Sequence, residues 1–118
     1  MDKLKVLFHV NDAERWNVAL GNITNLIKDV GKDAVDVVLI ANGQGVNAYA
    51  DGEKVAAMSA LADQGVQFCA CSNSLKMMCD AGNACMRHES LPSFVCIVPA
   101  GITAIVNRQR EGYAYVKP

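Results

Sequence analysis

Short apolar runs alternate with segments of helical periodicity along the whole chain, and this alternation constrains the fold most. The first run, "KVLFHV", is followed by a segment in which Trp16, Leu20, Ile23 and Ile27 recur at helical spacing. The same pair of patterns repeats to the end of the chain. The expected strands are residues 5–10, 34–42, 66–71, 93–99 and 113–117. The expected helices are residues 11–31, 53–63, 72–82 and 101–112, with loops at 43–52 and 82–91.

Strands that alternate with helices are typical of an α/β fold with a mainly parallel sheet and helices on both faces. A chain of 118 residues is long enough to bury one core, so we expect a single domain over residues 1–118. Asn11 is the expected cap of the first helix, and Gly31 is expected to end it.

Composition excludes several classes of protein. The net charge is -1, and there is no basic block, so a nucleic-acid partner is not expected. No apolar run approaches the roughly 20 residues of a membrane span, and the start "MDKLKVLFHVND" does not have the pattern of a signal peptide. The five cysteines are an odd number in a chain that needs no disulfide, which predicts a cytoplasmic protein with reduced thiols.

Polar residues follow the strands where such a sheet would carry its ligand crevice, beyond the carboxyl ends of the strands. A parallel sheet brings these ends to one edge. The candidate binding residues there are His9, Asn11, Asn42, Gly43, Ser72, Asn73 and Ser74. The alternative is that they are ordinary polar residues of turns.

Cys71 is the strongest single candidate for chemistry. It ends an expected strand and precedes an expected helix, and the free N–H groups of a helix start stabilise a thiolate and lower its pKa from about 8.5. The alternative is that Cys71 is a small buried apolar residue. Cys69 and Cys96 are expected to be such core residues. A Cys69–Cys71 disulfide is not expected, because two strand residues span roughly 6.6 Å.

Cys79, Cys85 and His88 form the pattern C-x5-C-x2-H, which is neither a usual zinc nor an iron–sulfur spacing. Two possibilities stay open. The three residues could join Cys71 in a metal site, or one of the two cysteines could be a resolving thiol for Cys71.

Three stretches together resemble the DsrE/DsrF-like family, in its small stand-alone branch. They are "VLFHVND" at the start, "GVQFCACSNSL" around Cys71, and "VPAGITAIVNRQREGYAYVKP" at the end. The resemblance implies a flavodoxin-like sandwich with about five mainly parallel strands, and homo-trimers or hexamers. It also implies that Cys71 matches the cysteine that carries sulfur as a persulfide. Relatives often have an Arg-Gly pair after this cysteine, where this chain has "LKMMCDAGNACMRHE".

These features together predict an intracellular sulfur-relay carrier without turnover or cofactor of its own. Cys71 would accept sulfane sulfur from a donor protein or small persulfide and pass it to a partner thiol. One alternative is a non-catalytic oligomeric module that binds a small nucleotide or metabolite near His9, Asn42, Gly43 and Asn73. Another is a metal or redox sensor built from cysteine and histidine.

Overall fold

A five-stranded sheet, parallel throughout, forms the centre of the molecule, in a computed structural model that describes residues 2–83 and 85–118. The strand order is β4-β3-β2-β1-β5, and every neighbouring pair is parallel. The strands are β1 (Leu4–Val10), β2 (Val35–Ala41), β3 (Gln67–Cys71), β4 (Val95–Val98) and β5 (Ala114–Val116). The predicted α/β class and flavodoxin-like sheet are therefore confirmed.

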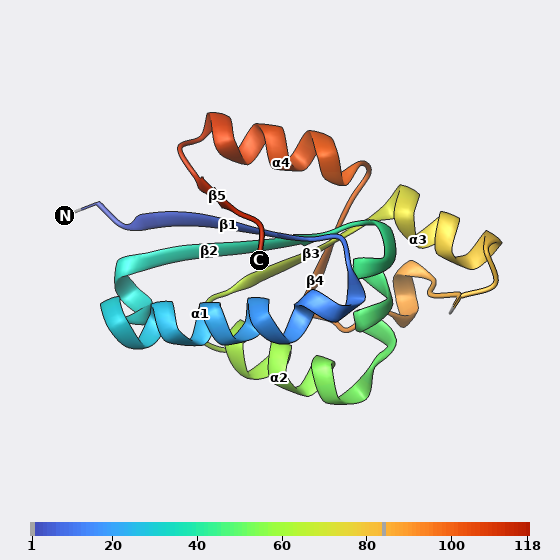
Figure 1. Ribbon diagram of the computed structural model, residues 1–118, viewed down its shortest axis with the longest axis horizontal. Helices are drawn as coiled ribbons and strands as arrows, with labels where there is room; N and C mark the ends of the chain where they lie inside the picture. The colour runs from blue at the N-terminus through green and yellow to red at the C-terminus, as the bar shows by residue number, and fades with distance from the viewer. Residues whose placement is uncertain (1, 84) are drawn as a thin grey trace.

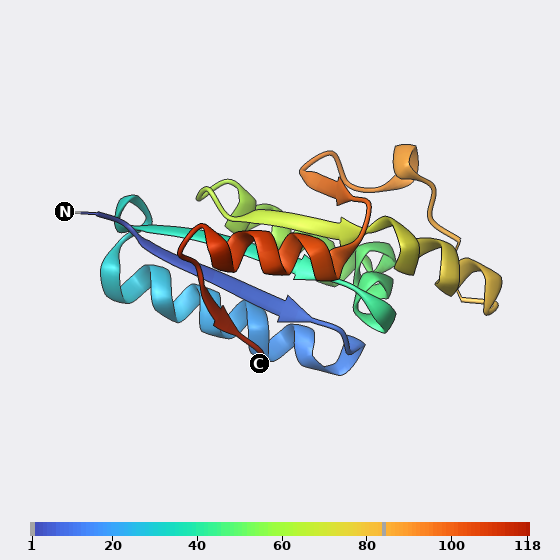
Figure 2. The ribbon, with the colours of Figure 1, turned by 90° about the horizontal axis from the view of Figure 1, so that it is seen from above.

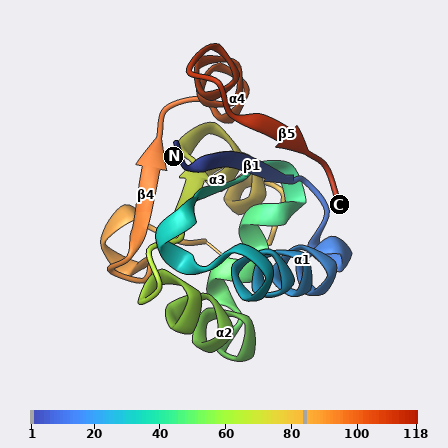
Figure 3. The ribbon, with the colours of Figure 1, turned by 90° about the vertical axis from the view of Figure 1, so that its left-hand side faces the viewer.

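Helices cover both faces of the sheet, as Figures 1 and 3 show. The helices are α1 (Trp16–Val30), α2 (Gly52–Ala62), α3 (Ser72–Asp80) and α4 (Gly101–Arg110). The chain steps in one direction from β1 to β4, so right-handed crossovers place α1 and α2 on one face. The return from β4 to β5 places α4 on the opposite face. In Figure 1, α3 extends beyond the carboxyl ends of the strands rather than over a face.

Two cores hold the three layers together. The larger one lies between the sheet and helices α1 and α2, and contains the fully buried Trp16 and Phe68. The smaller one lies under α4 and contains Leu7, Val38, Ile40, Cys69 and Ile105. β2 contributes to both cores, which explains why its sequence is apolar without alternation.

The start of the first helix and the 43–52 loop differ from expectation. The side chain of Asp12, rather than Asn11, accepts from the Glu14 N–H and caps a 3-10 turn before α1. Residues Gly43–Ala50 form a 3-10 segment instead of an irregular loop. The indole N–H of Trp16 donates to the Gly45 carbonyl at 2.7 Å, which fixes this segment to α1.

Cys96 is exposed, so the expectation that it is a core residue was wrong. β4 is an edge strand of the sheet. Figure 2 shows that α4 runs over the middle of the sheet and leaves β4 uncovered on that face. The expectation rested on the position of Cys96 in the middle of an apolar run, whereas its exposure depends on the place of β4 at the edge of the sheet.

Across the described residues, no helix combines the length and apolarity that crossing a membrane requires.

Gly45 is the glycine whose replacement we expect to damage the fold most. A Cβ atom on Gly45 would lie 2.2 Å from the Val10 carbonyl oxygen, whereas a Cβ on Gly21, in α1, meets nothing within 4 Å. Gly45→Ala should lower the free energy of unfolding by at least about 2 kcal/mol, because the backbone at Gly45 or Val10 must move to admit the added methyl group. Gly21→Ala, the matched control, should raise it by roughly 0.5–1 kcal/mol. Urea denaturation of both variants measures this, and equal stabilities would contradict the close approach at Gly45.

Candidate functional site

The carboxyl edge of the sheet brings most of the predicted site residues together. His9 lies at the end of β1, Asn42 and Gly43 directly follow β2, and Cys71 ends β3. The return of the chain from β4 adds the first turn of α4 to this edge. The site is therefore built from four separate segments that meet around the Cys71 sulfur.

Cys71 is the N-cap residue of α3, so its sulfur lies at the start of a helix as the sequence predicted. The residue is buried, with only 5% of its surface exposed. The backbone N–H of Gly101 donates to Cys71 Sγ at 3.2 Å across the sheet edge. The sulfur thus faces the starts of two helices, α3 and α4.

Hydrogen bonds lower the pKa of the Cys71 thiol. Burial alone would raise it, because a low dielectric disfavours the thiolate. The Ser74 hydroxyl and the backbone N–H groups of Gly101, Ser74 and Asn73 donate to the sulfur. Together they outweigh the effect of burial on the pKa. The arrangement therefore stabilises a thiolate, the nucleophilic form of cysteine.

Ser74 is held in place by its other neighbour. Its hydroxyl oxygen accepts from the Gly43 N–H at 2.8 Å, and the residue is buried. Because a hydroxyl has one proton, an oxygen that accepts from Gly43 leaves that proton free for the Cys71 sulfur. The turn after β2 therefore orients the strongest donor to the thiolate.

Gly101 is a functional residue to which the sequence alone assigned no role. A Cβ on Gly101 would lie 3.2 Å from both the Asn42 Cβ and the Cys71 Cβ, which is tighter than ordinary contact. Glycine therefore allows the start of α4 to approach the sulfur. The signal available in the sequence for this role was a glycine at the start of a helix, shortly after a strand.

His9 belongs to a hydrogen-bonded chain that ends beside Cys71. His9 Nε2 lies 2.8 Å from Asn42 Oδ1, and Nδ1 lies 2.6 Å from the Tyr115 hydroxyl. An amide oxygen only accepts, so Nε2 donates to Asn42, and in the neutral ring Nδ1 then accepts from the Tyr115 hydroxyl. Both ring nitrogens of His9 are thereby engaged. The Asn42 side chain in turn lies against Gly101, on the side of this residue that the Cys71 side chain also faces.

Tyr115 was not among the site residues predicted from the sequence. β5 pairs with β1 so that Tyr115 lies opposite Leu7, two residues before His9 on the same face of the sheet. Burial raises the pKa of the Tyr115 phenol, which keeps its proton available for His9. The strand pairing that brings Tyr115 to His9 has no local sequence signal.

Asn11 and Ser72 lie at the rim of the site. The Asn11 side chain accepts from Lys117 Nζ at 3.2 Å and does not reach the sulfur. Ser72 Oγ lies 3.4 Å from His88 Nε2 at an exposed position. Asn73 contributes its backbone N–H rather than its side chain.

Cys79 and Cys85 are joined by a disulfide, so the structure does not contain the fully reduced thiols that the sequence predicted. The bridge links the end of α3 to the following loop. Among residues 2–83 and 85–118, no group of three or more cysteine, histidine or acidic side chains is arranged to hold a metal ion. The proposed gathering of Cys71, Cys79, Cys85 and His88 is therefore not found.

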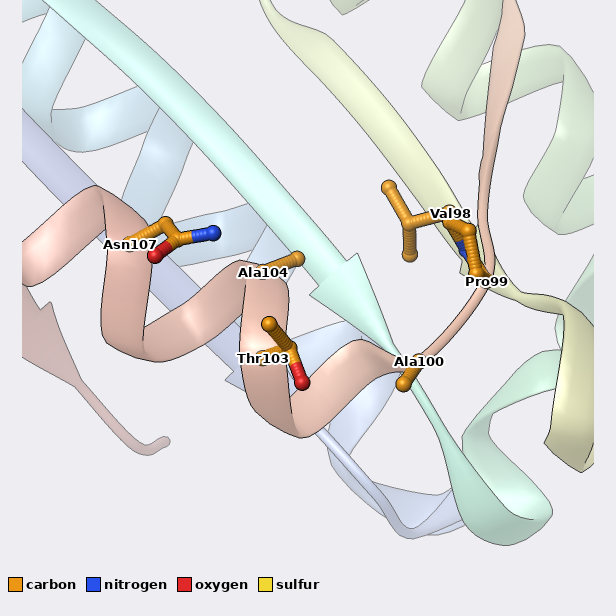
Figure 4. Close-up of a pocket in the computed structure, with 6 residues that line it drawn as sticks. All are labelled: Val98, Pro99, Ala100, Thr103, Ala104 and Asn107. Atoms are coloured by element: carbon orange, nitrogen blue, oxygen red, sulfur yellow. The ribbon is translucent and has the colours of Figure 1, made fainter.

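A mainly apolar cavity of about 310 Å³ lies beside the site, between β4 and α4. Figure 4 shows that α4 and the β4–α4 connection form its walls. Val98, one of its residues, pairs in register with Cys71. The lining residues are Val98, Pro99, Ala100, Thr103, Ala104 and Asn107.

Loss of the Ser74 hydroxyl should raise the pKa of Cys71. Hydrogen bonds to charged groups contribute about 1.5–3 kcal/mol, so Ser74→Ala should slow alkylation of Cys71 at neutral pH several-fold. The measurement is the pH dependence of iodoacetamide labelling, with peptide mass spectrometry to assign the adduct. Ser72→Ala is the control, because its hydroxyl faces His88. An unchanged profile in Ser74→Ala would contradict the assigned donor.

A known structure matches this chain over nearly its full length. No family model and no curated protein matches it. The match is titled "Structure of Protein of Unknown Function MTH1491 from Methanobacterium thermoautotrophicum". It is 36% identical, covers 98% of this chain and 100% of that chain, and has a TM-score of 0.82. With this identity over almost the whole of both chains, the protein belongs to the same family as MTH1491.

Proposed function

We propose that this protein is a sulfur carrier of the DsrE/DsrF-like type, in its small stand-alone branch. Cys71 would hold sulfane sulfur as a persulfide and pass it to a partner thiol. The observation that carries the proposal is the set of donors around one buried sulfur. The N–H groups of Asn73, Ser74 and Gly101 and the hydroxyl of Ser74 all favour its thiolate.

The transfer needs no external oxidant or reductant. The Cys71 thiolate attacks the outer sulfur of a donor R–S–SH, a new S–S bond forms, and the S–S bond of the donor breaks. The products are Cys71–S–SH and the donor thiolate R–S⁻, so atoms and electrons balance. In the return step a partner thiolate attacks the outer sulfur of Cys71–S–SH and regenerates the Cys71 thiolate.

The same donors serve both halves of this cycle. When the partner takes the outer sulfur, Cys71 is the leaving group, and a thiol of lower pKa leaves faster. Hydrogen bonds that stabilise the Cys71 thiolate therefore assist its release as well as its formation. Because only 5% of Cys71 is exposed, we expect small donors such as inorganic polysulfide to transfer sulfur to Cys71 most readily.

The His9 network supports a structural rather than a ligand-binding role for this part of the site. Both ring nitrogens of His9 are engaged, by Asn42 and Tyr115. Little hydrogen-bonding capacity remains there for a nucleotide or metabolite, which favours the carrier over the binding module. We propose that this network holds the Asn42 side chain against Gly101 and Cys71.

The resemblance also bears on the setting of the protein. We propose that it works as a homo-trimer or hexamer in the cytoplasm, with donor and acceptor proteins or small persulfides as partners and without a cofactor. The Cys79–Cys85 disulfide occupies the stretch in which relatives often have an Arg-Gly pair. It lies at the opposite end of α3 from Cys71, so we assign it no part in the transfer.

Mass spectrometry of the protein after incubation with polysulfide tests the carrier function. The wild type should gain one sulfur on the Cys71 peptide, releasable by a thiol, and Cys71→Ser should lose this gain. The double variant Cys79→Ser/Cys85→Ser should load as the wild type does, because its substitutions are far from the sulfur's donors. If Cys71→Ser gains sulfur as readily as the wild type, Cys71 is not the carrier.

A further inference from the structure

Cys69 and Cys96 lie directly opposite each other on neighbouring parallel strands. β3 and β4 pair with Cys69 and Cys96 in register, and both side chains point to the face that carries α4. Neighbouring strands lie about 4.7–4.9 Å apart, within the roughly 4.4–6.8 Å between Cα atoms over which two sulfurs can be bridged. The register therefore places the two thiols close enough for a single bridging atom to bond to both sulfurs.

The two thiols interact with each other. Burial raises the pKa of Cys69 to about 12, and the neighbouring Cys96 adds to the rise through its charge and through a hydrogen bond between the side chains. The Cys96 thiol otherwise makes one long contact, to the carbonyl of Ile97 at 3.9 Å.

Access to the pair comes from one side only. Cys69 is 2% exposed, whereas Cys96 is exposed on the part of β4 that α4 leaves open (Figure 2). A reagent can therefore reach Cys96 first and then engage Cys69 beneath it. This order of access favours a reagent that first binds Cys96 and then forms a second bond to Cys69.

A positive charge lies beside the buried thiol. The Arg108 guanidinium on α4 opposes the rise in the pKa of Cys69. It is held by hydrogen bonds to Gln67 Oε1 at 3.2 Å and Glu111 Oε1 at 3.3 Å. Gln67 is two residues before Cys69 on the same strand, so the guanidinium is positioned on the face of the pair. It can compensate the charge that two sulfurs carry when both have lost their protons.

We propose that Cys69 and Cys96 form a dithiol site, separate from Cys71, for soft thiophilic species that take two sulfur ligands. Soft ions prefer thiolate ligands over oxygen or nitrogen, and the pair supplies two of them. Trivalent arsenic is the test case. An arsenoxide R–As=O reacts with the two thiols to give R–As(S)₂ and one water, so two As–S bonds form and no electrons are transferred. The proposal does not depend on the sulfur-carrier function.

Phenylarsine oxide tests the site in the variant Cys79→Ser/Cys85→Ser, which removes the other pair of cysteines that could chelate arsenic. Intact-mass measurement of the reduced protein should show one phenylarsenic group per chain. Adding Cys96→Ser should abolish this adduct, or make it at least tenfold easier to remove with 1,2-ethanedithiol. Adding Cys71→Ser, the matched control, should leave it unchanged. Cys69→Ala should also abolish it, with thermal denaturation used to verify that this variant folds.

Three results would overturn the proposal: no adduct in the starting variant, an equally stable adduct after Cys96→Ser, or loss of the adduct after Cys71→Ser. The last result would place the arsenic on Cys71 and a neighbour instead. Sulfur loading of Cys71 in Cys96→Ser is measured in parallel. Because that loading requires only Cys71, the outcomes for the dithiol site and for the carrier function are independent.

Discussion

The contact on which the site depends is the hydrogen bond from the Gly101 N–H to the Cys71 sulfur. It joins the start of α4 to the end of β3, across the edge where the strands finish. A Cβ at position 101 would lie 3.2 Å from the Cβ atoms of Asn42 and Cys71, so glycine allows this approach without displacing either neighbour. The stabilisation of the buried thiolate therefore depends on the close approach of the start of α4 to the end of β3.

Much of the fold was predictable from local patterns. The apolar runs and the helical spacing of Trp16, Leu20, Ile23 and Ile27 depend only on neighbours in sequence, and they located all five strands and four helices. Cys71 was predictable for the same reason, because a strand end before a helix start is a local feature. The cap of the first helix was predicted wrongly: Asp12 rather than the adjacent Asn11 takes this position, and the Asn11 side chain accepts from Lys117 instead.

The parts that could not be predicted depend on strand order. Tyr115 reaches His9 because β5 pairs with β1, and Cys96 is exposed because β4 is an edge that α4 does not cover. Neither fact has a signature within a few residues of the position concerned. Cys69 and Cys96 show the same dependence, since the place of their strands in the sheet buries one and exposes the other although both lie in apolar runs.

The order of the strands along the chain also affects when the Cys71 site forms during synthesis. β5 follows α4 along the chain, and it carries the Tyr115 phenol that contacts His9 Nδ1 at 2.6 Å. Cys71 precedes α4 in the chain, so during synthesis its sulfur lacks the Gly101 donor until the start of α4 has packed against the end of β3. The thiol is therefore less acidic in the growing chain than in the finished protein. Activation of Cys71 thus accompanies its burial, because both depend on the packing of α4 at the end of β3.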